Sequence, residues 1–150
     1  ESTLKTLQNI HKTPLLDKEG SRGRWSNRLI AVFEPNTGNR QPEAVPSYDN
    51  KFNAADLVII PQLTRLKHDP KKTAPLDGAD IAKIISKTHP NAKYIEDDEK
   101  LVEFLVKNSS AGDVIVFLGS HGFRGMIDAL VRRLTCPHPQ SPLPPHRRRC

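Results

Sequence analysis

The sequence predicts an α/β domain with a mostly parallel sheet and helices on both faces. Three observations support this prediction. Continuous apolar runs of strand length recur along the chain, which is typical of strands covered on both faces. Segments with apolar residues at helical spacing separate these runs. Short links join the predicted strands to the predicted helices, and alternation of strands and helices favours right-handed crossovers between parallel strands. The expected fold class is therefore a three-layer Rossmann-like sandwich.

Size and composition limit the possible functions. A chain of 150 residues is long enough for one domain with a hydrophobic core and too short for two ordinary ones. No apolar run approaches the ~20 residues of a membrane helix, so we expect no membrane partner. Residues 1–10 lack the pattern of an export signal, which favours a cytoplasmic location. The net charge of +6 includes three arginines at 147–149, and aromatic residues are only 5%, so we expect no nucleic-acid partner.

Periodicity predicts the individual elements. Apolar runs predict strands at 28–34, 56–60, 93–97 and 114–118. We expect the strand at 114–118 to be central in the sheet, because it is apolar at every position. Helical spacing predicts helices at 1–11, 48–55, 77–87, 98–108 and 126–134. The acidic clusters at 77–80 and 96–99 precede two of these helices, and we interpret them as caps rather than catalytic groups.

A glycine-rich segment between the last strand and the last helix is the first candidate site. Glycines recur at Gly119, Gly122 and Gly125, and such a turn lets backbone approach a ligand closely. Free amides at a helix start attract carboxylates or phosphates, which makes Ser120, His121 and Gly122 candidate binding residues. The spacing matches neither the dinucleotide motif nor the phosphate loop. An alternative remains, in which the glycines only permit a tight turn and close helix packing.

The polar loop at 35–42 is the second candidate site. It follows a buried strand, and open α/β sheets bind ligands at the carboxyl ends of their strands. Arg40 offers a planar guanidinium suited to a carboxylate or phosphate. The long loop at 62–76 should reach the same cleft and could add Thr64, Arg65 and His68.

Composition changes abruptly after the last predicted helix. We therefore expect a domain over 1–135 and a disordered Pro/Arg-rich tail over 136–150. This tail contains four residues of a type that binds zinc: Cys136, His138, His146 and Cys150. Their spacing matches no standard zinc finger, so we expect no metal site.

Three segments carry a resemblance to a known family. Residues 27–35, 55–60 and 111–125 resemble the carboxy-terminal domain of the Mur ligases, and the similarity covers about residues 1–134. Phe33-Glu34-Pro35 and Gly122-Phe123 look most like the murein peptide ligase branch, which joins a peptide to UDP-N-acetylmuramate. Arg40, five positions after Pro35, is instead similar to the L-alanine-adding branch.

The resemblance implies an ATP-dependent amide ligase of peptidoglycan synthesis or recycling. It implies that ATP and magnesium are bound mainly by a central domain, which is missing here together with the amino-terminal domain, so the fragment alone should be inactive. Its implied partners are UDP-N-acetylmuramate and an incoming amino acid or peptide. By this analogy Arg40 pairs with the incoming carboxylate, Asn36 faces the substrate, and Ser120, His121 and Gly122 form the opposite wall. The alternative is a non-catalytic Rossmann-like module that binds a nucleotide or an anion.

Overall fold

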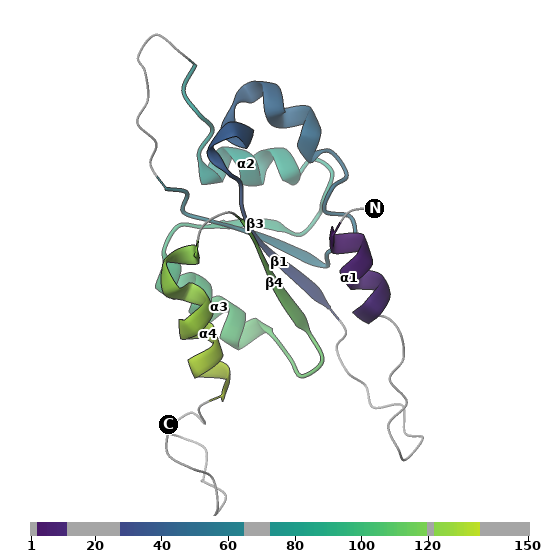
Figure 1. Ribbon diagram of the computed structural model, residues 1–150, viewed down its shortest axis with the longest axis vertical. Coiled ribbons are helices and arrows are strands. Elements are labelled where there is room, and N and C mark those ends of the chain that lie inside the picture. Colours follow the sequence, from purple (N-terminus) through teal and green to yellow (C-terminus); the bar gives the residue numbers. More distant parts are fainter. Residues whose placement is uncertain (1–2, 12–27, 65–72, 120–121, 136–150) are drawn as a thin grey trace, which may run out of the picture.

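Four parallel strands form a single sheet in the order β3-β2-β1-β4 (Figure 1). The computed structural model describes residues 3–11, 28–64, 73–119 and 122–135. Its strands are β1 (Leu29–Glu34), β2 (Leu57–Pro61), β3 (Ala92–Ile95) and β4 (Val114–Gly119). Its α-helices are α1 (Thr3–His11), α2 (Gly78–Ile85), α3 (Asp98–Asn108) and α4 (Met126–Thr135). Three 3-10 segments complete it: η1 (Thr37–Arg40), η2 (Pro42–Tyr48) and η3 (Phe123–Gly125). The predicted α/β class is confirmed.

Strand β1 lies at the middle of the sheet because it pairs on both sides. Ala31 is in register with Val58 of β2 and with Val116 of β4, and every pairing is parallel. The alternation of side chains along β1 places Leu29 and Ala31 in one core cluster and Ile30 in the other. Both faces of β1 are therefore buried, as a continuous apolar run requires.

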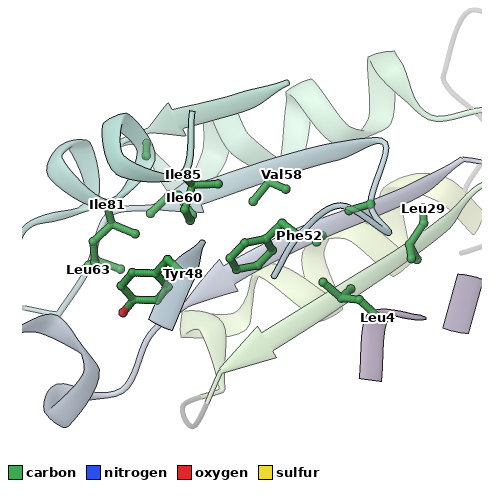
Figure 2. Close-up of a cluster of buried hydrophobic side chains, with 12 residues drawn as sticks. Leu4, Leu29, Tyr48, Phe52, Val58, Ile60, Leu63, Ile81 and Ile85 are labelled. Atoms are coloured by element: carbon green, nitrogen blue, oxygen red, sulfur yellow. The ribbon is translucent and has the colours of Figure 1, made fainter. Parts of the chain in front are cut away.

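Helices cover both faces of the sheet (Figure 1). Helix α2 and Leu4 of α1 contribute to the core on one face, while α3 and α4 pack on the other. Figure 2 shows the first cluster, in which Tyr48 and Phe52 come from the segment between β1 and β2. The Phe33 ring contacts both, at centroid distances of 5.9 Å to Tyr48 and 5.0 Å to Phe52. These ring contacts hold the polypeptide that follows β1 against the sheet.

Acidic caps begin two helices, as the sequence predicts. The Asp77 carboxylate accepts a hydrogen bond from the Asp80 amide at 2.8 Å, and the Asp80 side chain accepts one from the Asp77 amide, which completes a capping box on α2. The Asp97 carboxylate accepts from the Lys100 amide at 2.8 Å at the start of α3. None of the helices in the described ranges has the length and apolar character needed to cross a bilayer.

Two sequence predictions are wrong. Strand β4 is an edge strand of the described sheet rather than a central one, and its five apolar side chains are only partly buried. An apolar run indicates that helices cover the two faces of a strand. It does not indicate how many strands lie beside it, because strand order depends on the path of the connections between strands. The predicted helix at 48–55 is absent: the structure has the 3-10 segment η2 before it and turns from Asp49 to Ala54. Phe52 is nevertheless buried, and its packing outweighs the local helical pattern.

Candidate functional site at the carboxyl edge of the sheet

The loops after β1, β2 and β4 meet at one edge of the sheet. They do so because the three strands are parallel, so their carboxyl ends lie on the same side. Arg40, in the loop after β1, donates through Nη1 to the carbonyl oxygen of Thr64 at 2.6 Å. Arg124, in the segment after β4, donates through Nη2 to the carbonyl oxygen of Gln62 at 2.9 Å. Both arginines therefore contact the polypeptide that follows β2.

Arg40 is a buried cation. Its side chain is held by two backbone carbonyls, that of Thr64 and that of Leu76, which accepts from Nε at 3.1 Å. Only 6% of the residue is exposed, and among the described residues no carboxylate lies within ion-pair distance of it. Burial lowers the pKa of the guanidinium, although the charges of Glu34 and Asp77 oppose this effect. An arginine stays charged in proteins, so its positive charge is only partly compensated here.

Glu34 ends β1 and lies between the arginines of the two loops. The residue is 2% exposed. Its carboxylate accepts from Thr64 Oγ1 at 3.4 Å, and both carboxylate oxygens lie 3.4 Å from Nη1 of Arg124. These distances are longer than those of ordinary charge-assisted hydrogen bonds. Glu34 therefore contributes a buried negative charge to the edge, and its described donors all lie at 3.4 Å.

Arg124 connects three segments of the edge. In addition to Gln62 and Glu34, it binds the Asp98 carboxylate in a bidentate manner, with Nε at 2.7 Å and Nη2 at 2.8 Å. Hydrogen bonding to Asp98 raises the pKa of the Arg124 guanidinium, which keeps it charged. One side chain thus joins the segment after β4 to the end of β1, the start of the loop after β2 and the first turn of α3.

The three glycines at the end of β4 and after it meet different requirements. A Cβ atom on Gly119 would lie 2.9 Å from both the Glu34 carbonyl oxygen and the Phe123 ring, so this glycine permits a close approach between strands. Gly125 has a φ of +81°, a conformation that other residues rarely adopt. A Cβ atom on Gly122 would meet nothing within 4 Å, and its φ of −74° suits any residue. The fold therefore does not require glycine at position 122.

The remaining predicted site residues differ in what the structure shows. Asn36 is exposed, and its side-chain oxygen accepts from the Asn39 amide at 3.1 Å, which caps η1. Thr64 lies at the edge and contacts Glu34, as described above. Other named residues lie outside the described residues: Ser120, His121, Arg65, His68, Cys136, His138, His146 and Cys150.

Two hollows open on the described surface. One of about 640 Å³ borders the carboxyl edge and is lined by Gln62 and residues 95–100, which include Asp98. Another of about 630 Å³ lies at the opposite, amino edge, next to Arg28, Asp56 and Asn91 at the starts of β1, β2 and β3. The first hollow lies at the edge where parallel α/β sheets bind ligands, but its lining includes neither Arg40 nor Asn36.

No group of three His, Cys, Asp or Glu side chains in the described residues lies together as metal ligands would.

Sequence reasoning missed Glu34 and Arg124 as site residues and interpreted Asp98 only as part of a capping cluster. A charged residue that directly ends an apolar strand, as Glu34 does, was the available indication. Arg124 gave none, because its three contacts come from segments 26, 62 and 90 positions away in sequence.

Comparison with known proteins gives relatives of one class. No model of a known protein family matches the sequence. Over 102 residues, 68% of the chain, it is 28% identical to the UDP-N-acetylmuramate–L-alanine ligase of Caldanaerobacter subterraneus subsp. tengcongensis. Over 103 residues, again 68%, it is 30% identical to the ligase of the same name from Desulfitobacterium hafniense. The matched segments make up 22% and 23% of those relatives, so the chain spans less than a quarter of their length.

Solved structures share the fold. A domain assigned to a UDP-N-acetylmuramate:L-alanyl-γ-D-glutamyl-meso-diaminopimelate ligase of Haemophilus ducreyi matches with a TM-score of 0.51 and 19% identity, over 89% of this chain and 79% of that one. A murein peptide ligase of Psychrobacter arcticus matches with a TM-score of 0.57 and 19% identity, over 87% of this chain and 25% of that one. The chain is therefore a domain related to the Mur ligases. L-alanine-adding enzymes resemble it in sequence, and peptide-adding enzymes resemble it in fold.

Proposed function

We propose that this chain is the carboxy-terminal, substrate-binding domain of an ATP-dependent Mur-type ligase. The whole enzyme would join an amino acid or peptide to UDP-N-acetylmuramate during peptidoglycan synthesis or recycling in the cytoplasm. ATP, with magnesium, would activate the muramyl carboxylate as an acyl phosphate, and the incoming amine would attack it. In this proposal the central domain would bind ATP and magnesium, and this chain would hold and orient the incoming group.

The observation that carries the proposal is the incompletely compensated charge of Arg40. Among the described residues the hydrogen-bond partners of the buried Arg40 guanidinium are two neutral carbonyl groups, and such a cation favours an anionic partner, because burial strengthens its electrostatic interactions. Arg40 lies at the edge where parallel sheets bind ligands. The carboxylate of an incoming amino acid or peptide has the required charge and the planar shape that a guanidinium binds. The similarity to Mur ligases supplies a reaction in which such a group is needed.

The other residues of the proposed site come from the loop that holds Arg40 and from the segment after β4. Asn36 begins the same loop, four positions before Arg40. Ser120, His121 and Gly122 follow β4, whose carboxyl end lies beside that of β1. We assign them to the wall opposite Arg40. The lack of any contact for a Cβ atom at Gly122 supports a position that faces open space rather than the core.

Two incoming groups are candidates, each with its own support. L-Alanine is favoured by the curated relatives, which are L-alanine ligases at 28% and 30% identity. The peptide L-alanyl-γ-D-glutamyl-meso-diaminopimelate is favoured by the triplet Phe33-Glu34-Pro35 and by the pair Gly122-Phe123. Both carry a carboxylate that Arg40 could bind.

The test is a titration of the isotope-labelled chain with each candidate, followed by NMR at the Arg40 side chain and the surrounding amides. We expect saturable binding of one of the two. Arg40→Gln should weaken that binding by about tenfold, which corresponds to the loss of one charge-assisted hydrogen bond. Arg40→Lys, which keeps the charge but not the planar donor pair, should give an intermediate affinity.

Two controls make the result specific. Arg28→Gln removes an arginine at the amino edge that pairs with Asp113 at 2.6 Å, and it should leave binding unchanged. L-Alaninamide, which lacks the carboxylate, should not bind. Equal affinity in the wild type and in Arg40→Gln, or resonance changes confined to the amino edge, would contradict the proposed role of Arg40.

A further inference from the structure

Arg124 lies in a backbone conformation that the sequence does not favour. Phe123 and Arg124 both have φ of 49°, followed by Gly125 at 81°, so three successive residues lie in the left-handed region. This conformation is unfavourable for residues that carry a Cβ atom, and it persists only where surrounding contacts hold it. The Phe123 side chain is buried against Phe117, with ring centroids 5.0 Å apart. The Arg124 side chain adds contacts to Asp98, Gln62 and Glu34.

The contacts of Arg124 lead to Arg40 through Glu34 and Thr64. Nη1 of Arg124 faces the Glu34 carboxylate, whose Oε1 also accepts from the Thr64 hydroxyl at 3.4 Å. The Thr64 carbonyl oxygen in turn accepts from Nη1 of Arg40 at 2.6 Å. The charge of Glu34 also acts directly on the Arg40 guanidinium. Arg124 thus contacts the buried Glu34 carboxylate, whose charge also acts on Arg40, and both arginines donate to the polypeptide that follows β2.

We propose that Arg124 is a positioning residue that sets the arrangement of the carboxyl edge and thereby the position of Arg40. By binding Asp98, Gln62 and Glu34 together, it holds the segment after β4 against the loop after β2 and leaves the Glu34 carboxylate between the two arginines. This role rests on the proposed function, because it specifies how the site for the incoming carboxylate is held in place. Arg124 itself does not contact the substrate in this account.

A measurement without ligand tests the structural part of the proposal. In the wild type, the Arg40 Nε proton is protected by the Leu76 carbonyl, and the Leu76 amide donates to the Arg40 carbonyl at 2.7 Å. We expect Arg124→Gln to accelerate the exchange of both protons with solvent by about tenfold, because local opening becomes more frequent when a charge-assisted pair is lost. Arg133→Gln is the matched control, since Arg133 of α4 likewise binds a carboxylate in the first turn of α3, through an exposed ion pair with Glu99 at 2.9 Å.

A measurement with ligand tests positioning rather than stability alone. The ligand is whichever of L-alanine and the tripeptide binds the wild type. We expect Arg124→Gln to weaken that binding by about fivefold to tenfold and Arg124→Lys to recover part of it. The double variant with Arg40→Gln should bind no more weakly than Arg40→Gln alone, because Arg124 acts only through Arg40. Thermal unfolding of each variant shows that the domain remains folded.

The outcomes separate this proposal from the proposed function. If the wild type binds neither ligand, the proposed function fails, and the exchange measurement still decides whether Arg124 holds Arg40. If exchange at Arg40 and Leu76 is the same in Arg124→Gln as in the wild type, the positioning role is wrong. It is also wrong if the effects of the two substitutions on binding are additive, since independent sites add.

Discussion

The end of β4 approaches the end of β1 so closely that a Cβ atom on Gly119 would lie 2.9 Å from the carbonyl oxygen of Glu34. Such a distance is too short for any real side chain, and the opposing atom belongs to rigid backbone. Gly119, the last residue of β4, therefore allows two strand ends of the candidate site to lie side by side. Glu34 then faces Arg124 from that position.

We expect Gly119→Ala to lower the free energy of unfolding by about 1–3 kcal/mol, because the added methyl group overpacks this contact. The matched substitution Gly122→Ala should raise it by about 0.4–1 kcal/mol, since the position is open and its φ is compatible with alanine. Urea unfolding of both variants measures the two changes. If both substitutions change the free energy of unfolding in the same direction, the close contact at Gly119 and the open space at Gly122 do not determine stability.

Gly122→Ala also tests the proposed binding site independently of stability. If Gly122 faces the incoming group, the variant should bind the ligand more weakly than the wild type while remaining at least as stable. Titration of the folded variant, followed by NMR, gives the answer. An unchanged affinity would remove Gly122 from the proposed wall.

Asp98 should contribute more to stability than its neighbour Glu99. Asp98→Asn breaks a bidentate pair with Arg124 that is partly shielded from solvent, and it should cost about 1 kcal/mol. Glu99→Gln removes an exposed single contact with Arg133 and should change stability by less than about 0.5 kcal/mol. Both substitutions are compared by chemical denaturation at the same salt concentration. A larger loss from Glu99→Gln would contradict the structural ranking.

The buried Tyr48 hydroxyl should make the fold sensitive to alkaline pH. Burial raises the pKa of Tyr48, although the charge of Arg40 opposes this shift, and the hydroxyl donates to the Asn39 carbonyl. A raised pKa means that the folded state favours the neutral phenol. This stabilisation is complete below the pKa of an unfolded tyrosine, about 10, and is lost as the pH rises through the higher folded-state value.

Tyr48→Phe should therefore flatten the loss of unfolding free energy that we expect above about pH 10. Tyr94→Phe is the control, because Tyr94 is only partly buried although its pKa is also raised by burial. Denaturant unfolding at a series of alkaline pH values gives, for each of the three proteins, the slope of the free energy of unfolding against pH. If Tyr48→Phe and the wild type lose stability in parallel, Tyr48 does not cause the alkaline sensitivity.

The core beneath α3 and α4 should depend strongly on Ile59. This residue is fully buried in β2 and belongs to the second core cluster. Ile59→Ala should lower the free energy of unfolding by about 2–5 kcal/mol, through lost burial and the cavity that remains. Ile127→Ala, at a position 39% exposed, should change it by less than about 1 kcal/mol. A shift in the urea midpoint, with no change in the dependence of the free energy of unfolding on urea concentration, would identify each difference as a change in stability.

Most secondary structure could be predicted because it depends on neighbours in the sequence. The four strands and four α-helices lie within a few residues of their predicted positions, since side-chain periodicity already shows which residues must be buried. Asp77 was correctly interpreted as a cap because its partner, Asp80, is only three residues away. The common edge for the loops after β1, β2 and β4 also followed, because alternating strands and helices favour a parallel sheet.

The sequence by itself thus determined the α/β class, the helix starts and the parallel arrangement that places the strand ends of β1, β2 and β4 on one side. Only the tertiary structure decided that β4 lies at the edge of the described sheet, that Arg40 is buried with no described carboxylate within ion-pair distance, and that Arg124 joins three segments. The physical reason is the separation in sequence between the residues that interact. Periodicity and capping act over a few residues, whereas strand order and the partners of a buried charge are set by contacts between segments up to 90 positions apart.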